Sequence, residues 1–81
     1  MSDYIPIACS FYDELELRAM RGRQVKVTYL TADGLSTTRV ARILDVFARG
    51  QEEFIRLEPD EEIRLDRLMS IDGLARPGAG C

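Results

Sequence analysis

Apolar residues near the start of the chain recur at the spacing of a helix. When successive residues are placed 100° apart, one arc of about 100°, wide enough to bury, collects Phe11, Tyr12, Leu15 and Ala19. This pattern predicts a helix over about residues 10–20. Ser10 followed by Asp13 has the form of a helix start, and Gly22 is placed to end the helix as a C-cap residue.

The other side of the predicted helix combines acid with apolar side chains. Asp13 and Glu16 are three residues apart, and Leu17 and Met20 share their side. An ordinary amphipathic helix would present these acids to solvent only. Two large apolar residues beside the acids favour a second interpretation, in which this side is a binding surface.

After Gly22 the period changes from helical to two. Residues 24–30, "QVKVTYL", alternate in the manner of a half-buried strand. Asp33 and Gly34 then form a dipeptide suited to the positive φ angles of a tight turn. The first two strands are therefore expected to form a hairpin.

The stretch 36–47 is long for one strand, and its apolar positions change phase. Ala41 and Ile43 keep one parity, whereas Leu44 and Val46 keep the other. A bulged or bent strand that crosses two layers of a barrel would show this change.

Three more short strands are expected, at residues 52–58, 62–66 and 67–71, with a turn at Pro59 and Asp60. One helix followed by about five antiparallel strands predicts a mainly β fold, a small barrel of the Sm-like or SH3-like kind. Residues 1–72 would form one domain, and 73–81, rich in glycine, alanine and proline, a flexible tail. The predicted core contains Val25, Val27, Ile43, Ile55, Leu57, Ile63 and Leu65.

The charge composition of the chain indicates which kind of partner it can bind. The 81 residues suit a single compact core, and the net charge is -3 with 11 basic residues scattered along the chain. Nucleic-acid binding depends mostly on clustered Lys and Arg, so a positively charged partner fits better. No apolar run approaches a membrane span and no signal peptide is evident, so a cytoplasmic protein is expected.

Catalytic and metal chemistry are not expected. The chain has no histidine, and Cys9 and Cys81 are its only cysteines. This excludes Ser/His and Cys/His pairs and a zinc site of the usual Cys/His type, so neither an enzyme nor a bound metal or cofactor is predicted. Cys9 is expected to be a reduced, small buried hydrophobe. The acids at 58–62 are interpreted as a solvated loop rather than a calcium site.

The residues resemble a known family. "YIPIACSFYDELELRA", the "TADG" hairpin, "EEFIRLE" and "IRLDRLMSI" are together similar to the Rho-binding antiterminator (Rof) family of small bacterial proteins, over Tyr4 to about Ile71. The resemblance implies an Sm-like barrel with an N-terminal helix. It also implies inhibition of the transcription termination factor Rho, through binding to the N-terminal RNA-binding domain of Rho so that RNA cannot enter.

Three hypotheses of function follow. In the leading hypothesis the chain is a protein inhibitor of Rho and a monomer when free, with Asp13 and Glu16 as anchors, Glu14 and Leu17 as further contacts, and the acids at 58–62 adding long-range steering. In the alternative it is an Sm-like RNA-binding module, whose arginines come together from different strands. A third possibility is a subunit that only oligomerises through an edge strand.

Overall fold

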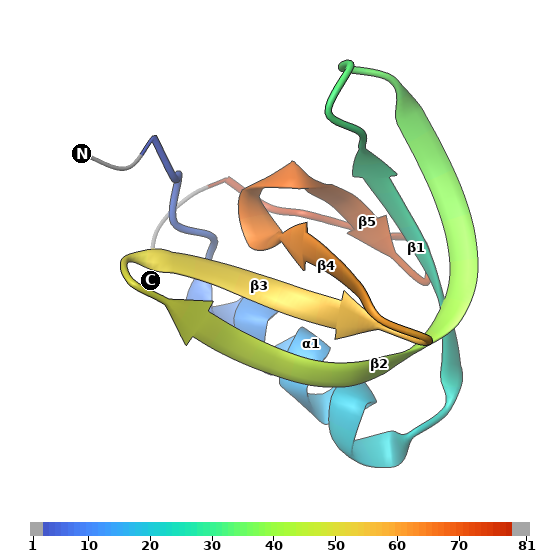
Figure 1. Cartoon of the computed structure of the whole chain (residues 1–81). Helices are drawn as coiled ribbons and strands as arrows, with labels where there is room; N and C mark the ends of the chain where they lie inside the picture. Colours follow the sequence, from blue (N-terminus) through green and yellow to red (C-terminus); the bar gives the residue numbers. More distant parts are fainter. Residues whose placement is uncertain (1–2, 79–81) are drawn as a thin grey trace.

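The computed structural model of the protein describes residues 3–78 and is mainly β (Figure 1). The predicted class, one N-terminal helix followed by antiparallel strands, is confirmed. In chain order the elements are α1 (Cys9–Arg21), β1 (Gln24–Leu30), β2 (Ser36–Arg49), β3 (Glu52–Leu57), β4 (Glu61–Arg64), a 3₁₀ turn η1 (Leu65–Arg67), β5 (Leu68–Ile71) and β6 (Leu74–Ala75).

The C-terminal end of α1 agrees with its prediction, whereas the N-terminal end does not. Gly22 ends the helix as expected, at a φ of 66°, and its N–H lies 3.3 Å from the carbonyl oxygens of Arg18 and Ala19. The N-cap, however, is Ala8, which makes no side-chain cap. The prediction that Ser10 caps the helix is wrong. Ala8 is buried directly before the helix, and the first turn therefore starts at Cys9.

Cys9 also differs from its prediction as a small buried hydrophobe. Its side chain is exposed and disulfide-bonded rather than a reduced thiol. The positions that do reach the core here are Ile7, Ala8 and Phe11. Cys9 lies between them on the outward side of the first turn, which is why it is not buried.

Strands β1 and β2 form the predicted hairpin, which projects from the rest of the sheet (Figure 1). Alternate residues of β1, Val25, Val27 and Tyr29, are buried, as the period of two predicts. At the turn, Gly34 has a φ of 83° and the Thr31 N–H donates to the Leu35 carbonyl over 2.7 Å. The Asp33-Gly34 turn prediction is therefore confirmed.

The bend predicted in the second strand is confirmed at Leu44. The register of β2 against β3 pairs Ile43 with Leu57 and then Asp45 with Arg56, so Leu44 is the extra residue of a bulge. Residues 36–42 of β2 pair with β1, whereas its second half pairs with β3. One long strand thereby belongs to both halves of the sheet.

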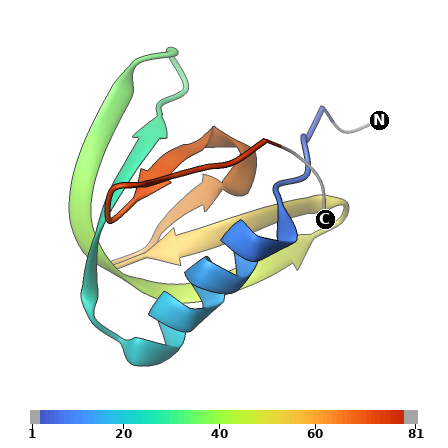
Figure 2. The same cartoon turned by 180° about the vertical axis from the view of Figure 1, so that it is seen from behind.

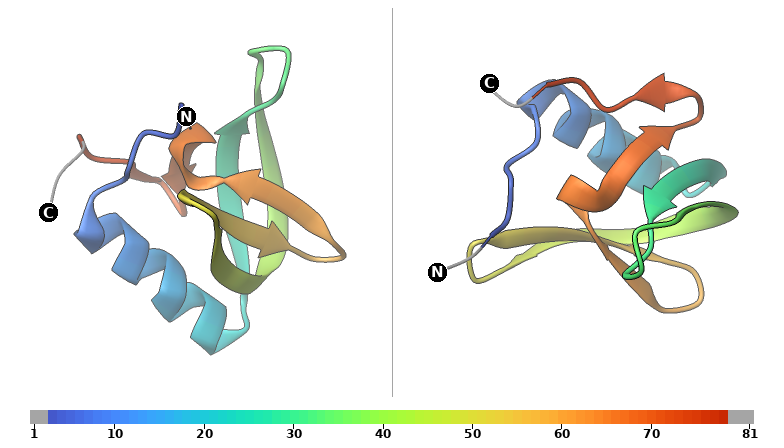
Figure 3. Two further views of the ribbon diagram at one scale, coloured as in Figure 1. Left: turned by 60° about the vertical axis from the view of Figure 1, so that its left-hand side comes forward. Right: turned by 90° about the horizontal axis from the view of Figure 1, so that it is seen from above.

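The sheet is strongly curved but open, in the order β4-β3-β2-β1-β5-β6 (Figure 3). The expected closed barrel of about five strands is not formed, and a sixth, two-residue strand is present. Closure fails because the chain leaves β4 through the η1 turn, and within residues 3–78 neither β4 nor β6 pairs across the gap. Both edge strands are short, which limits pairing with other chains.

Helix α1 covers the core, which lies inside the curve of the sheet (Figure 2). Phe11 and Leu15 are buried, and Tyr12 and Ala19 pack beside them, so the predicted inward side of the helix is confirmed. All seven predicted core residues are buried as well: Val25, Val27, Ile43, Ile55, Leu57, Ile63 and Leu65.

The sheet continues past the boundary expected at residue 72. Leu74 and Ala75 form β6 against β5, and the Arg76 side chain donates from Nε to the Leu68 carbonyl over 2.8 Å. The expected start of the flexible tail at residue 73 is therefore too early. The last part of that tail, residues 79–81, lies outside the described residues.

Candidate protein-binding face

The two predicted anchor residues stand on the outer surface of α1. Asp13 and Glu16 are both exposed, and among residues 3–78 no ion pair involves either of them. Most acids of the described chain lie within ion-pairing distance of an arginine, so the pair differs from the majority of acids in this protein. Their carboxylates are available to a cation on another molecule.

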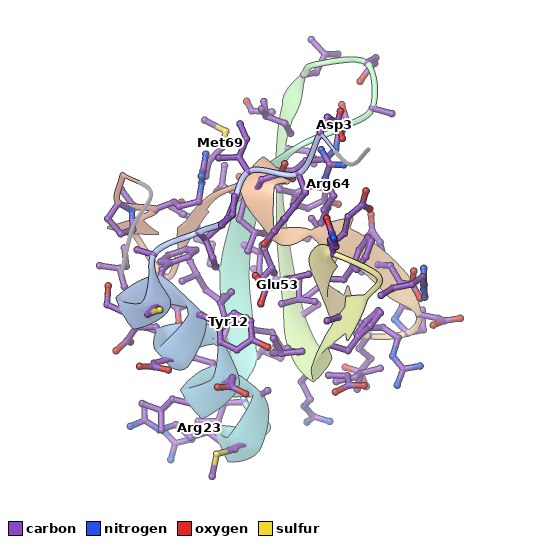
Figure 4. All side chains as sticks on the ribbon, turned by 90° about the vertical axis from the view of Figure 1, so that its left-hand side faces the viewer. Asp3, Tyr12, Arg23, Glu53, Arg64 and Met69 are labelled. Atoms are coloured by element: carbon purple, nitrogen blue, oxygen red, sulfur yellow. The ribbon has the colours of Figure 1, made fainter. Side chains whose placement is uncertain are left out.

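Two further acids, which sequence reasoning missed, gather beside this pair. Asp45 lies just after the bulge of β2, and Glu53 lies on β3 beside Tyr12 of the helix (Figure 4). Burial, and then the negative charges of Glu16, Glu53 and Asp45, raise the pKa of Tyr12. We call Asp13, Glu16, Asp45 and Glu53 the acidic face.

Glu53 is held in place by the segment that precedes the helix. The Tyr4 hydroxyl donates to Glu53 Oε1 over 2.9 Å, and the Arg64 guanidinium lies 5.8 Å from the centre of the Tyr4 ring. Arg64 also pairs with Asp3 at 2.8 Å (Figure 4). It pairs with Asp66 at 2.7 Å. Burial first, and then the Glu53 carboxylate, raise the pKa of Tyr4, so this hydroxyl stays a donor.

The acidic face is hollowed at two places, both beside α1. A groove of about 380 Å³ separates the helix from the bulge of β2, and a second groove, of about 310 Å³, separates its first turns from β3. The first is lined by Glu16, Ala19, Met20, Leu44, Asp45 and Val46. The second is lined by Pro6, Ile7, Cys9, Tyr12, Asp13 and Glu53. Each groove therefore combines apolar walls with two carboxylates.

Glu14, the third predicted acid, is not part of this face. Its carboxylate pairs with Arg18 at 2.5 Å, and Arg18 in turn pairs with Asp72 at 2.9 Å. At about 100° per residue, Glu14 lies some 160° around the helix from Glu16, on the side of β5 and β6. The structure therefore engages Glu14 within the fold and separates it from Asp13 and Glu16.

Leu17, the predicted apolar contact, is 38% exposed, and Met20 one turn further is 84% exposed. Both point away from the core on the outer side of α1, between the acids of its first half and Arg21 at its end. An exposed pair of this size on one helix can contribute apolar contact area to an interface.

The acids of the 58–62 loop are engaged internally. Glu61 pairs with Arg39 and accepts the Tyr29 hydroxyl over 2.9 Å. Glu62 accepts two hydrogen bonds from Arg49, at 3.1 and 3.0 Å, and this guanidinium lowers the pKa of Glu62. Glu58 and Asp60 lie 4.0 and 3.8 Å from arginines. These pairs reduce the outward field with which the loop would steer a basic partner.

The chemistry of the acidic face is that of a cation acceptor. Four carboxylates from three elements surround a tyrosine, and carboxylates bind arginine through paired N–H donors. Within residues 3–78 no three side chains of the metal-binding kinds are grouped to hold a metal ion. No helix of that same region combines the length and apolar character required to cross a membrane.

No protein-family model, curated protein or solved structure shows significant similarity to the chain.

Proposed function

We propose that the protein inhibits the transcription termination factor Rho by binding its N-terminal RNA-binding domain through the acidic face. The observation that carries the proposal is a group of four carboxylates, Asp13, Glu16, Asp45 and Glu53, that lie close together and form no ion pair within residues 3–78. An RNA-binding surface is rich in Lys and Arg. A grouped set of carboxylates resembles the phosphates that such a surface accepts.

In this mechanism the acidic face occupies the site that RNA would use. Asp13 and Glu16 contact basic residues of the partner, Leu17 adds apolar contact, and Asp45 and Glu53 extend the charged area onto the sheet. The proposal includes no catalytic step, cofactor or metal, and it places the protein in the cytoplasm. We also propose that the curved sheet is an open variant of the Sm-like fold, which the helix-then-strands order supports.

An RNA-binding module, the alternative function, is less well supported. Six arginines form ion pairs with acids of the chain itself: Arg18, Arg39, Arg42, Arg49, Arg56 and Arg64. A guanidinium that is already paired has less attraction left for a phosphate. This favours a basic protein over RNA as the partner.

The test is a binding titration of the purified protein with purified Rho, together with competition by single-stranded RNA. The double reversal Asp13→Arg and Glu16→Arg is expected to raise the dissociation constant by about 30-fold or more, since losing close charge pairs typically costs roughly 2 to 5 kcal/mol. The matched control reverses Asp60 and Glu62 on the loop, which changes the net charge by the same amount away from the face.

Thermal melting of each variant separates lost binding from lost folding. Binding at wild-type strength by the Asp13/Glu16 variant, or simultaneous binding of RNA and the protein to Rho, would show that the proposed mechanism is wrong. Retention of RNA rather than Rho by the immobilised wild-type protein would support the alternative instead.

A further inference from the structure

On the outer surface of α1 the side chains change from acidic to apolar to basic along the helix axis. Asp13 stands in the first half, Leu17 near the middle, and Arg21 in the last turn. These positions are four residues apart, so they follow one side of the helix and drift by only about 40° per step. All three side chains are exposed, and Met20 lies beside them.

This order is self-complementary. If a second helix of the same kind packs antiparallel, centred on Leu17, the Asp13 of each copy comes level with the Arg21 of the other. The Leu17 side chains of both copies then meet in the centre, and the Met20 of each copy lies about one turn away on either side of them. A twofold axis produces this arrangement without any other surface, because the same patch serves both subunits.

We propose that the protein self-associates into a twofold-symmetric dimer through the outer surface of α1, with Asp13 of each copy paired to Arg21 of the other. Within the described chain neither residue takes part in an ion pair, so both charges remain available. The partner at this surface is a second copy, because the order acid, apolar residue, base along one helix faces base, apolar residue, acid in an antiparallel copy. The sequence alone predicted a monomer when free.

The dimer is weak and sensitive to salt. A helix of 13 residues is about 20 Å long, and contact along one such helix buries less than the roughly 1,200 Å² of standard protein interfaces. Its ion pairs are solvent-exposed, so a Debye length of about 8 Å at physiological ionic strength already screens part of their attraction. Association therefore requires a high protein concentration and is strongest in dilute buffer.

Self-association through this surface also covers Asp13 and Glu16. This consequence alone rests on the proposed function. If that function is correct, a protein molecule in the dimer cannot bind Rho at the same time. The pool of dimer would then hold the inhibitor inactive at high concentration and release it on dilution.

The experiment is sedimentation equilibrium of the full chain at low and at high salt, with no partner present. We expect a reversible dimer at low salt that dissociates at high salt. Asp13→Arg alone and Arg21→Asp alone should each weaken the dimer by at least about tenfold, because each replaces two symmetry-related attractions by repulsions. The double variant Asp13→Arg with Arg21→Asp has the wild-type net charge and should restore the dimer.

Arg67→Asp is the matched control, because it removes an exposed arginine away from α1, and it should leave the dimer unchanged. A monomer at every concentration and salt would overturn the proposal, as would a double variant no stronger than the single ones. Circular dichroism confirms that each variant is folded. Because Rho is absent, these results are independent of the proposed function.

Discussion

The hydroxyl of Tyr4 donates a hydrogen bond to Glu53 Oε1 over 2.9 Å, although the two residues are 49 positions apart in the chain. This contact fastens the segment before the helix to strand β3. It also fixes one carboxylate of the acidic face. The N-terminal segment is thus part of the folded unit and supports the candidate site directly.

Tyr4→Phe removes this hydrogen bond and keeps the ring. We expect the free energy of unfolding to fall by about 1 to 2 kcal/mol, because a partly buried hydrogen bond to a charged acceptor is lost. Urea denaturation measures the change. Tyr12→Phe is the control, since within residues 3–78 no hydrogen bond of its hydroxyl is found, and an equal loss in both variants would contradict the assignment.

Leu57→Ala tests the core that the curved sheet encloses. Leu57 is fully buried on β3, so truncation should cost about 2 to 5 kcal/mol of unfolding free energy. Leu35→Ala makes the same chemical change at a side chain that is 65% exposed at the hairpin tip, and it should cost less than about 0.5 kcal/mol. Thermal and urea unfolding of both variants provide the comparison.

Asp72 should make the free energy of unfolding depend on pH in the acid range. Its carboxylate accepts a hydrogen bond from the Lys26 N–H over 2.9 Å and also pairs with Arg18. The Lys26 bond first, and then Arg18, hold the pKa of Asp72 below its ordinary value of 3.8. A depressed folded pKa stabilises the protein above the ordinary value, and this contribution is lost as pH falls through the folded pKa. Asp72→Asn should therefore be less stable than wild type at pH 7, with the difference shrinking below about pH 4.

The size of that difference should be below about 1 kcal/mol, because the Asp72 carboxylate is partly solvated and its pair with Arg18 is screened. Urea unfolding between pH 2 and 7 measures it. Asp60→Asn, which removes a carboxylate from an exposed pair at 3.8 Å, is the control. A difference that grows toward low pH would reverse the sign and refute the explanation.

Truncation after Asp72 should destabilise the protein. It removes β6 together with the Arg76 N–H to Met69 carbonyl bond of 2.9 Å and the Arg76 side-chain bond to Leu68. In reducing buffer, where Cys9 is a thiol in both proteins, loss of these partly exposed hydrogen bonds is expected to cost about 1 to 2 kcal/mol. Arg76→Ala in the full chain isolates the side-chain part. Unchanged stability of the truncated protein would instead support the tail boundary predicted from sequence.

Local patterns in the sequence were sufficient for most of the elements and the core. The helical period of Phe11, Leu15 and Ala19, the alternation in β1 and the Asp33-Gly34 turn all depend on neighbours within a few residues, and each is found in the structure. The phase change in 36–47 likewise predicted a bent or bulged strand, and the structure places the bulge at Leu44. Burial follows from these periods, because one side of each element must leave water.

Contacts between distant parts of the chain decided the rest. Glu14 and Glu16 are equivalent acids in the sequence, but Arg18, which also pairs with Asp72, engages Glu14, while the fold brings Asp45 and Glu53 near Tyr12 beside Glu16. The start of the helix moved to Cys9 because Ile7 and Ala8 pack into the core. Whether the sheet closes depended on the path of the chain after β4. Such outcomes depend on which partners meet across the folded chain, and short-range periodicity carries no information about that.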